Sequence, residues 1–298
     1  MTDVFVVGAL HLDVVVTASR LPMLDETLFG EGVAYRFGGK GGNQALAAAR
    51  MGAATAMAGQ VGDDAFAGIV LAELDRSGVD RSQVLQTAGA TGMSVAIVEA
   101  GGDYGAVVVS GVNRQIDPQR VDPGDAAVVV LQNELPEEVN SAVLRTLRRG
   151  ATLILNAAPA RTLSADLLSR VDILVVNRVE AAQMTDLDDG DLKLEDAARA
   201  LRARGPECVI VTGGAAGAVI FDGVSLDWVR PPREAKGSSH GAGDAFVGAL
   251  AAEIAAGGSI GDAARFAAAA AAHFVATPAD ERAAIRRADV DAWMAAGD

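Results

Sequence analysis

The stretch GAGDAFVGALAAEIAA, residues 241–256, places a short glycine turn directly before an apolar, alanine-rich helix. Small residues at a helix N-terminus leave backbone N–H groups free to face an anion. Asp244 lies at the edge of that pocket, where its charge would repel a phosphate that merely rested there. It therefore favours a proton acceptor for an incoming hydroxyl group, at a place where a phosphoryl group moves. Taken alone, a turn in which Asp244 is the N-cap residue explains the stretch equally well.

A second glycine cluster, FGGKGGNQ at residues 37–44, precedes another alanine-rich helical stretch, residues 45–52. It is not a Walker A loop, because Lys40 is followed by Gly41 and not by Ser or Thr. The cluster is therefore a glycine loop of another kind, again at the start of a helix.

A dinucleotide fingerprint is also absent. The first expected strand, residues 4–7, is followed by GALHLD, residues 8–13, which lacks the G-x-G-x-x-G pattern. This argues against a nicotinamide or flavin oxidoreductase. Asp13, Lys40 and Asn43 are polar and stand beside flexible glycines, so together they can reach several hydroxyl groups of a polyol. The two glycine clusters thus favour a sugar over an apolar ligand.

These residues together resemble the ribokinase-like carbohydrate kinases, the PfkB family. Both family signatures, residues 38–52 and 238–248, are present in order and at the expected separation. The resemblance runs from the opening strand to the final helix, and two signatures are more specific than one glycine motif. Within the family, the sequence GGKGGNQ is most similar to that of ribokinases, but the identity of the substrate is a weaker inference than family membership.

The fold class follows from alternating apolar patterns. The chain has 298 residues, half of them hydrophobic, so it can bury a large core. Short apolar runs alternate with helical segments, which predicts a mostly parallel sheet covered on both faces. The expected strands include residues 128–131, 152–155, 173–176 and 209–211, and the expected helices include residues 137–148 and 195–204. The resemblance implies an α/β three-layer αβα sandwich with a small β-strand lid, in a single kinase domain over residues 1–298.

Two segments without helical pattern are expected to form the lid. Residues 27–36 and 92–109 contain alternating apolar runs, the second set of them around Gly101-Gly102-Asp103, as is typical of hairpins. The resemblance implies that lid strands come from about residues 26–37 and 92–112 and cover the sugar. It also implies that the lid can join two copies in a homodimer.

Composition narrows the partners and the compartment. The net charge, 25 minus 39 or −14, argues against nucleic acid and anionic membranes, which are bound through basic surfaces. Lone Cys208 lies in an apolar run and is expected to pack in the core. The start of the chain carries Asp3 and no basic segment, which argues against a signal peptide, and the apolar run at residues 266–272 is too short to span a bilayer. We expect a soluble, cytoplasmic enzyme.

The resemblance implies a set of sugar-binding residues. They are His11, Asp13, Gly39, Lys40, Gly41, Asn43, Glu134 and Asp244. Carboxylates accept hydrogen bonds from sugar hydroxyl groups and Lys40 and Asn43 donate them, so that one primary hydroxyl group faces Asp244. Two alternatives stay open: Asp13 can cap a strand end, and Glu134 can be a first-turn acid of the helix that follows Pro136.

Two further elements match the nucleotide site of the family. VNRVE, residues 176–180, matches an Asn-x-x-Glu element associated with Mg²⁺, which Glu180 is expected to bind through water. TGGAAG, residues 212–217, matches the loop around the adenosine phosphates. A strand-end turn before an exposed helix Glu and an ordinary hairpin turn are the alternatives. The ATP-binding residues implied are Asn177, Glu180, Thr212, Gly214, Gly217 and Gly243.

The reaction that the resemblance implies is transfer of the γ-phosphoryl group of Mg-ATP to a primary hydroxyl group of a small sugar, ribose or a related pentose. Asp244 would accept the proton, while N–H groups of Gly241, Ala242 and Gly243 stabilise the transferring group. The alternatives are a nucleoside kinase, a kinase of another sugar such as a ketohexose or a sugar acid, and a noncatalytic sensor of nucleotide or sugar.

The chain departs from the ribokinase pattern at three places. His11 replaces an Asn in the first sugar-contact segment, and a histidine that titrates near neutral pH can select another hydroxyl pattern or a charged substituent. A His11 ring that is simply hydrogen-bonded to a neighbouring backbone group is the alternative. SSH, residues 238–240, replaces Asp-Thr-Thr, so that His240 adjoins the turn. Ala279 and Ala283 replace the Gly and Ser of a monovalent-cation loop. Because a carboxylate and a hydroxyl ligand are lost, we expect activity without K⁺ dependence.

Overall fold

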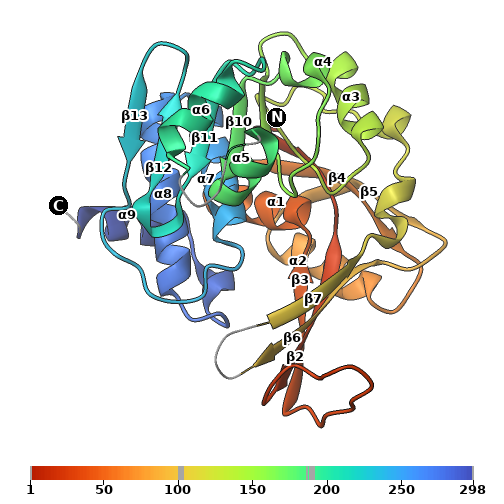
Figure 1. The fold of residues 1–298 in the computed structure, drawn as a ribbon. Coiled ribbons are helices and arrows are strands. Elements are labelled where there is room, and N and C mark those ends of the chain that lie inside the picture. The colour runs from red at the N-terminus through yellow and green to blue at the C-terminus, as the bar shows by residue number, and fades with distance from the viewer. Residues whose placement is uncertain (1, 100–103, 186, 188–191, 297–298) are drawn as a thin grey trace.

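The nine-stranded central sheet organises the molecule (Figure 1). The computed structural model describes residues 2–99, 104–185, 187 and 192–296. The strand order is β13-β12-β11-β10-β9-β8-β1-β4-β5; neighbours from β11 to β5 run parallel, whereas β12 and β13 are antiparallel additions. The strands are β1 (Val4–Val7), β4 (Thr55–Gly62), β5 (Asp80–Thr87), β8 (Val128–Gln132), β9 (Thr152–Asn156), β10 (Ile173–Asn177), β11 (Cys208–Thr212), β12 (Ala218–Phe221) and β13 (Leu226–Val229).

Strand β1 shows why these short apolar runs become central strands. Side chains alternate between the two faces of a strand, and here both faces are buried. Val4 and Val6 enter one hydrophobic core, whereas Phe5 and Val7 enter the other, and all four are at most 2% exposed. The sheet therefore carries a separate core on each face, and helices must cover both.

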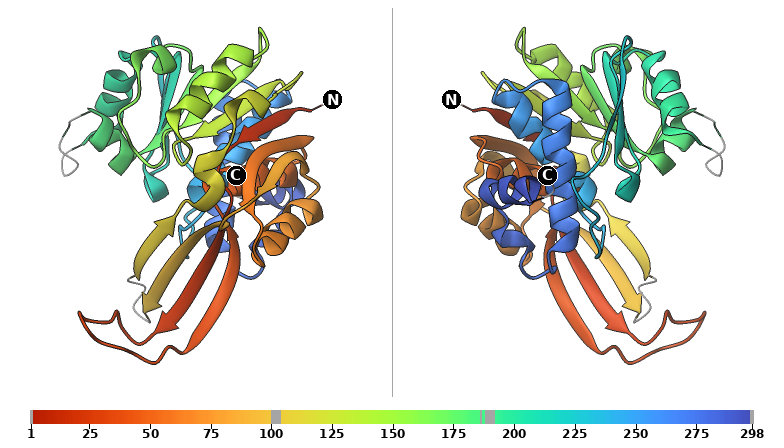
Figure 2. Two further views of the ribbon diagram at one scale, coloured as in Figure 1. Left: turned by 90° about the vertical axis from the view of Figure 1, so that its right-hand side faces the viewer. Right: turned by 90° about the vertical axis from the view of Figure 1, so that its left-hand side faces the viewer.

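The helices form the two outer layers (Figures 1 and 2). One core contains residues of α1 (Lys40–Arg50), α2 (Ala67–Arg76), α7 (Ala242–Ala255), α8 (Ile260–Ala276) and α9 (Arg287–Ala295). The other contains residues of α3 (Glu137–Thr146), α4 (Ala165–Leu168), α5 (Arg178–Thr185) and α6 (Leu194–Arg202). Short 3₁₀ turns are η1 (Gly111–Gln115), η2 (Pro118–Arg120), η3 (Gly214–Ala216) and η4 (Arg282–Ala284). The three-layer α/β sandwich expected from the sequence is confirmed.

A second, four-stranded sheet projects from the body as a lid (Figure 2). Its order is β3-β2-β6-β7, from β2 (His11–Ala18), β3 (Gly32–Gly38), β6 (Gly92–Glu99) and β7 (Tyr104–Val109). Strand β2 pairs antiparallel with β3 and parallel with β6. Sequence reasoning did not assign β2 to the lid, because its apolar run has no local feature that separates it from a core strand. The expected hairpin turn at residues 101–103 lies outside the described residues.

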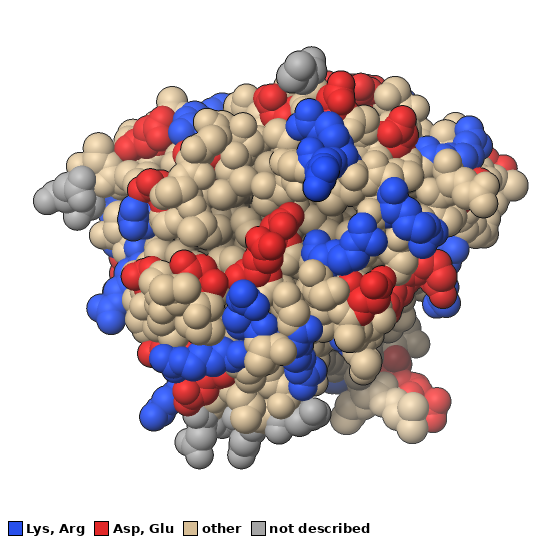
Figure 3. Space-filling model, turned by 90° about the horizontal axis from the view of Figure 1, so that it is seen from above, with Lys and Arg blue, Asp and Glu red and all other residues tan. Residues whose placement is uncertain are grey.

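The surface carries charges of both signs. On the face seen from above, basic and acidic side chains are interspersed (Figure 3). Within the described part of the chain, no helix combines the length and apolarity needed to cross a bilayer.

Candidate active site

The glycine turn before α7 lies between two cavities. Gly241 is the N-cap residue of α7 and has a left-handed backbone, with φ of 83°, which glycine adopts without strain. The first cavity, of about 400 Å³, is lined by Asp13, Asn43, His240, Gly241 and Asp244 among others. The second, of about 300 Å³, is lined by Thr212, Gly214, Gly217, Ala242 and Gly243 among others. Consecutive residues at the start of α7 thus line two different cavities.

Asp244 is not a helix cap. It lies in the first turn of α7, 8% exposed, and its side chain accepts hydrogen bonds from two residues of α1. Gln44 Nε2 donates to Asp244 Oδ1 at 2.9 Å, and Asn43 Nδ2 lies 3.4 Å from Asp244 Oδ2. Burial raises the pKa of Asp244, while the charge of Lys40 and these two hydrogen bonds oppose the rise. These hydrogen bonds therefore fix the orientation of the carboxylate.

Buried amides hold Gln44 in turn. Gln44 Nε2 also donates to Asn156 Oδ1 at 3.0 Å, and Gln44 Oε1 accepts from Gln132 Nε2 at 2.7 Å. Gln44 is fully buried, so these partners replace the water it lost on folding. Gln132 and Asn156 end the neighbouring parallel strands β8 and β9, which places both at the carboxyl edge of the sheet. Sequence reasoning assigned no role to these three amides, although a polar residue ending an apolar strand was a usable pattern.

Lys40 lies among three carboxylates. Burial lowers the pKa of Lys40, but the charges of Asp244, Glu134 and Glu180 outweigh burial and leave the pKa raised. Burial raises the pKa of Glu134 to about 7, against a hydrogen bond from Lys40 N to Glu134 Oε2 at 2.7 Å and the charge of Lys40. Helix α3 begins only at Glu137, so Glu134 is not a first-turn acid. Lys40 and Glu134 therefore interact electrostatically with Asp244, although neither side chain lines the first cavity.

The raised pKa of Glu134 predicts how stability depends on pH. Between the ordinary value of 4.5 and about 7, the unfolded chain ionises first, so the ligand-free protein loses stability as pH rises. Glu134→Gln keeps an acceptor for Lys40 N and removes the ionisation. We therefore expect Glu134→Gln to become more stable relative to wild type as pH rises. Its free energy of unfolding minus that of wild type, measured by urea unfolding, should be larger at pH 8 than at pH 5.

The matched control for this experiment is Glu138→Gln, which removes an exposed carboxyl group from α3. Its difference from wild type should be the same at both pH values. A Glu134→Gln difference that stays constant, or that changes in the opposite direction, would contradict the burial of an ionisable carboxyl group here.

Gly39 and Gly41 serve close packing of the loop before α1. A Cβ on Gly39 would lie 2.5 Å from Ala9 O, and one on Gly41 would lie 2.5 Å from Gly8 Cα. Gly39 also has φ of 87°. The backbone approach lets α1 begin directly against the end of β1, which aims Asn43 and Gln44 at α7. Among the described residues neither glycine lines the first cavity, so their visible contribution is to geometry.

Asp13 lies within β2 and lines the first cavity, so it does not cap a strand end. It stands opposite Arg36 in the β2–β3 register. Burial raises the pKa of Asp13, and Asp244 adds to the rise, whereas His240 and Arg36 oppose it. This places Asp13 near the turn, as the sequence interpretation required.

His11 differs from expectation. Its side chain is buried beside Gly92, is 4% exposed, and does not line the first cavity. Within the described structure, Nε2 has no hydrogen-bond partner. Burial lowers the pKa of His11 to about 4, so the prediction that it titrates near neutral pH is wrong. The ring is neutral at pH 7, and it offers no charge to a substituent of the ligand.

The Asn177–Glu180 element also fits its alternative interpretation, a turn at the end of a strand that leads into a helix. Glu180 N donates to Asn177 Oδ1 and Asn177 N donates to Glu180 Oε2, both at 2.8 Å, which forms a reciprocal cap for α5. Glu180 nevertheless faces the site: burial raises its pKa, and Lys40 and Asp244 act on it. Among the described residues its Oε1 makes no hydrogen bond, so one oxygen is free to face water. No group of three acidic, His or Cys side chains suited to a metal occurs in the described part of the chain.

The loop at residues 212–217 is both a hairpin connection and a cavity wall. It joins the antiparallel strands β11 and β12 through η3. Gly214 and Gly217 have φ of 61° and 97°, and a Cβ on Gly217 would lie 2.1 Å from Val229 O. Thr212, Gly214 and Gly217 line the second cavity together with Gly243, whereas Asn177 and Glu180 do not. Four of the six predicted nucleotide-site residues thus share one space.

Known proteins resemble this chain in both sequence and fold. The model of the pfkB family of carbohydrate kinases matches residues 1–283. The ribokinase of Bacillus subtilis (strain 168) is 34% identical over 278 residues, covering 90% of each chain, and that of Lactococcus lactis is 32% identical over 274 residues, covering 90% of this chain and 88% of the other. The structure of Arabidopsis thaliana ribokinase complexed with ribose and ATP superposes with a TM-score of 0.88 at 28% identity and covers 98% of each chain.

Proposed function

The chain belongs to the PfkB family of carbohydrate kinases, and we propose that it transfers the γ-phosphoryl group of Mg-ATP to a primary hydroxyl group of ribose or a related pentose. One observation carries the proposal: the glycine turn at 241–243 and Asp244 lie between two cavities. A donor in one cavity and an acceptor in the other would meet at this turn, as in-line transfer requires.

The first cavity suits the sugar. Asp13 and Asp244 offer carboxylate acceptors there, and Asn43 offers an amide. We propose that these residues bind the sugar directly. Lys40 and Glu134 would act from beside Asp244, and Gly39 and Gly41 would shape the start of α1, the helix that carries Asn43. For His11 we propose a role in shaping the floor of the site as a neutral ring.

The second cavity suits the nucleotide. The backbone at Gly214 and Gly217 can approach a phosphate or ribose closely, while Phe246 and Val275 supply an apolar wall of the kind that receives a base. The Arabidopsis relative, whose structure is described as a complex with ribose and ATP, supports ATP as the donor. Asn177 and Glu180 would lie toward the phosphates.

In the proposed mechanism, Asp244 accepts the proton of the hydroxyl group that attacks phosphorus. Its hydrogen bonds with Gln44 and Asn43 keep one oxygen aimed at the acceptor. N–H groups of Gly241 and Gly243 would stabilise negative charge on the transferring group, and the charge of Lys40 adds to that field. The sequence also predicts this role for Ala242, but Ala242 N already donates to Ser239 O at 3.0 Å. Closure of the lid would exclude water from the reacting group.

The residues present fit Mg²⁺. Glu180 keeps one unbonded carboxylate oxygen near Lys40 and Asp244, and a lone carboxylate with water is a common protein contribution to Mg²⁺ that is otherwise held by phosphates. We propose that Glu180 holds the ion through water. When bound, Mg²⁺ supplies charge that offsets the negative charge of the phosphate oxygens.

A panel of acceptors tests the proposal and separates its nearest rivals. ADP release from Mg-ATP would be measured with ribose, other pentoses, ketohexoses, sugar acids and nucleosides. We expect the highest kcat/KM with a pentose. A nucleoside or ketohexose in first place would move the chain to another branch of the family, and tight ATP binding without ADP release across the panel would favour a noncatalytic sensor.

The site also predicts catalysis without K⁺. Ser238 stands where the resemblance to ribokinases implies an Asp, and Ala279 and Ala283 supply no side-chain oxygen. We expect kcat in KCl to equal kcat in tetramethylammonium chloride at matched ionic strength. A large rate increase specific to KCl would contradict this prediction.

We also propose that residues 1–298 act as one kinase domain in the cytoplasm, the compartment that supplies ATP. A homodimer through the lid is supported by its exposed apolar side chains, since Val33, Val107 and Val109 are 58%, 68% and 55% exposed. Light scattering of the purified chain tests this, and a monomeric mass would count against it.

A further inference from the structure

Arg282 joins two segments beside the glycine turn. It lies on η4 and lines the first cavity next to His240 and Gly241. Its Nη2 donates to Ser238 O at 2.7 Å, its Nη1 to His240 O at 3.2 Å, and its Nε to Thr277 O at 3.1 Å. All three nitrogens of the guanidinium group thus donate a hydrogen bond to a backbone carbonyl group.

The same guanidinium group is placed by an aromatic ring. It lies 4.4 Å from the centre of the Phe274 ring, a cation–π contact with α8. That ring also borders the turn, because a Cβ on Gly241 would lie 3.3 Å from Phe274 Cζ. Phe274 therefore contacts both Arg282 and the N-cap of α7.

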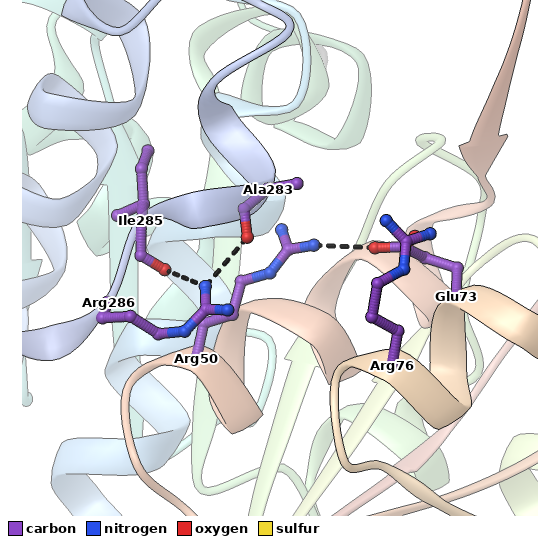
Figure 4. A network of polar contacts seen from close by, with 6 residues as sticks. All are labelled: Arg50, Glu73, Arg76, Ala283, Ile285 and Arg286. Carbon is purple, nitrogen blue, oxygen red and sulfur yellow. Dashed lines mark hydrogen bonds and ion pairs between the residues drawn. The ribbon is translucent and has the colours of Figure 1, made fainter.

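The segment that carries Arg282 is itself held in place. Arg286 Nη1 donates to Ala283 O at 2.8 Å and to Ile285 O at 2.9 Å (Figure 4). These two hydrogen bonds hold the backbone at the end of η4 and directly after it. Arg50, at the end of α1, lies beside this segment and pairs with Glu73 of α2. Arg282 thus projects from an anchored turn, whereas the loop that it contacts has few other bonds.

That loop depends on Arg282 for its external contacts. Within the described part of the chain, the other hydrogen bonds of residues 238–240 are local: His240 N donates to Ser238 Oγ at 3.4 Å and Ser239 O accepts from Ala242 N at 3.0 Å. Of the two carbonyl groups of this loop that Arg282 binds, that of His240 immediately precedes Gly241, and that of Ser238 lies two residues further back. A shift of these carbonyl groups would turn the N–H groups of the glycine turn away from the proposed position of the phosphoryl group.

The charge of Arg282 is not neutralised by an acid. Among the described residues, no carboxylate forms an ion pair with it, and its neighbour Arg36 is also a cation. Burial lowers the pKa of Arg282 and Arg36 lowers it further. Three backbone carbonyl groups, each bonded to a different nitrogen, therefore surround this positive charge.

We propose that Arg282 is a positioning residue that acts as a built-in cation: its guanidinium group holds the Ser238, His240 and Thr277 carbonyl groups and so orients the N–H groups of Gly241 and Gly243 toward the phosphoryl group. The inference rests on the proposed kinase activity. It explains in addition why the loss of a carboxylate at Ser238 and of a hydroxyl group at Ala283 is compatible with an ordered turn.

The test is chemical rescue of Arg282→Ala. Assays would follow ADP release with the best acceptor of the panel, in tetramethylammonium chloride, with and without low, non-denaturing guanidinium chloride or with KCl. We expect kcat to fall by about 10-fold or more while the KM for Mg-ATP changes little, because the misoriented donors act mainly on the transition state. We expect guanidinium to restore kcat several-fold in this variant and to leave wild type unchanged.

Two further variants make the outcome decisive. Arg287→Ala removes an arginine that also lies over an aromatic ring, Phe266, and pairs with Glu253, away from the turn; it should keep wild-type kcat without response to guanidinium. Arg282→Lys keeps the charge but cannot bridge three carbonyl groups, and it should lose part of kcat even if the Ala variant fails to fold.

Wild-type kcat in either Arg282 variant would overturn the proposal. So would a folded, impaired Arg282→Ala enzyme that neither guanidinium nor K⁺ improves, since that would assign Arg282 a purely structural role. If the wild-type protein releases no ADP with any acceptor, the proposed function itself has failed. Wild-type ADP release is therefore measured before any variant is compared.

Discussion

Asp244→Asn is expected to lower kcat by about 10³-fold, because the amide cannot accept the proton of the attacking hydroxyl group. The substitution keeps the size of the side chain, and Asn Oδ1 can still accept from Gln44 Nε2. The second cavity is formed by other residues, so the dissociation constant of Mg-ATP should change little. Turnover is measured by ADP release and nucleotide affinity by calorimetry.

The control for this prediction is Asp172→Asn. Asp172 is another partly buried carboxylate, whose Oδ2 accepts a hydrogen bond from Leu153 N at 2.6 Å, and burial raises its pKa as well. It lies outside both cavities that meet at the turn. It should therefore keep wild-type kcat. Near-normal turnover by Asp244→Asn would remove Asp244 from the role of base.

Gln44→Glu is expected to lower kcat/KM by up to about 100-fold on the acid side of the pH–rate profile. The new carboxylate would put oxygen against Asp244 Oδ1 and Asn156 Oδ1, where Gln44 now donates. Two carboxyl groups at hydrogen-bond distance share a proton, which raises the apparent pKa of the pair by about two pH units. A base that must be ionised then works only at higher pH, so the acid limb of the pH–rate profile should move upward.

Asn140→Asp is the matched control for Gln44→Glu. Asn140 is as fully buried as Gln44, and its amide donates to Gln132 O at 3.0 Å, but it makes no contact with Asp244. This variant should lose stability without any shift of the pH–rate profile. If Gln44→Glu also left the profile in place, the amide would not tune the base.

The parts of the site that could be predicted from sequence are those with local demands on the chain. The glycine clusters at residues 38–42 and 241–243 are visible in the sequence because glycine adopts without strain the positive φ found at Gly39 and Gly241, and because there is no room for a Cβ at Gly38, Gly41 and Gly42. Short runs buried on both faces likewise predict a parallel sheet. The family resemblance then supplied the order in which these pieces meet.

The remaining parts depend on contacts between distant segments. Gln44 reaches Asp244 across 200 positions, and Arg282 reaches Ser238 across 44, so no window of sequence displays either pair. Strand β2 joined the lid for the same reason, through pairing with β3 and β6. His11 shows the opposite error: its residue type suggested titration, but burial, which sequence does not reveal, keeps the ring neutral.

The most direct test of the account is a comparison of D-ribose with 5-deoxy-D-ribose as acceptors for the wild-type enzyme. Both sugars share the ring hydroxyl groups, but the second lacks the primary hydroxyl group that Asp244 is proposed to deprotonate. With Mg-ATP, we expect ribose to give ADP and a sugar phosphate in equal amounts, and 5-deoxyribose to give neither. Equal ADP release with both sugars, or none with ribose despite bound ATP, would contradict phosphoryl transfer to a primary hydroxyl group of this pentose.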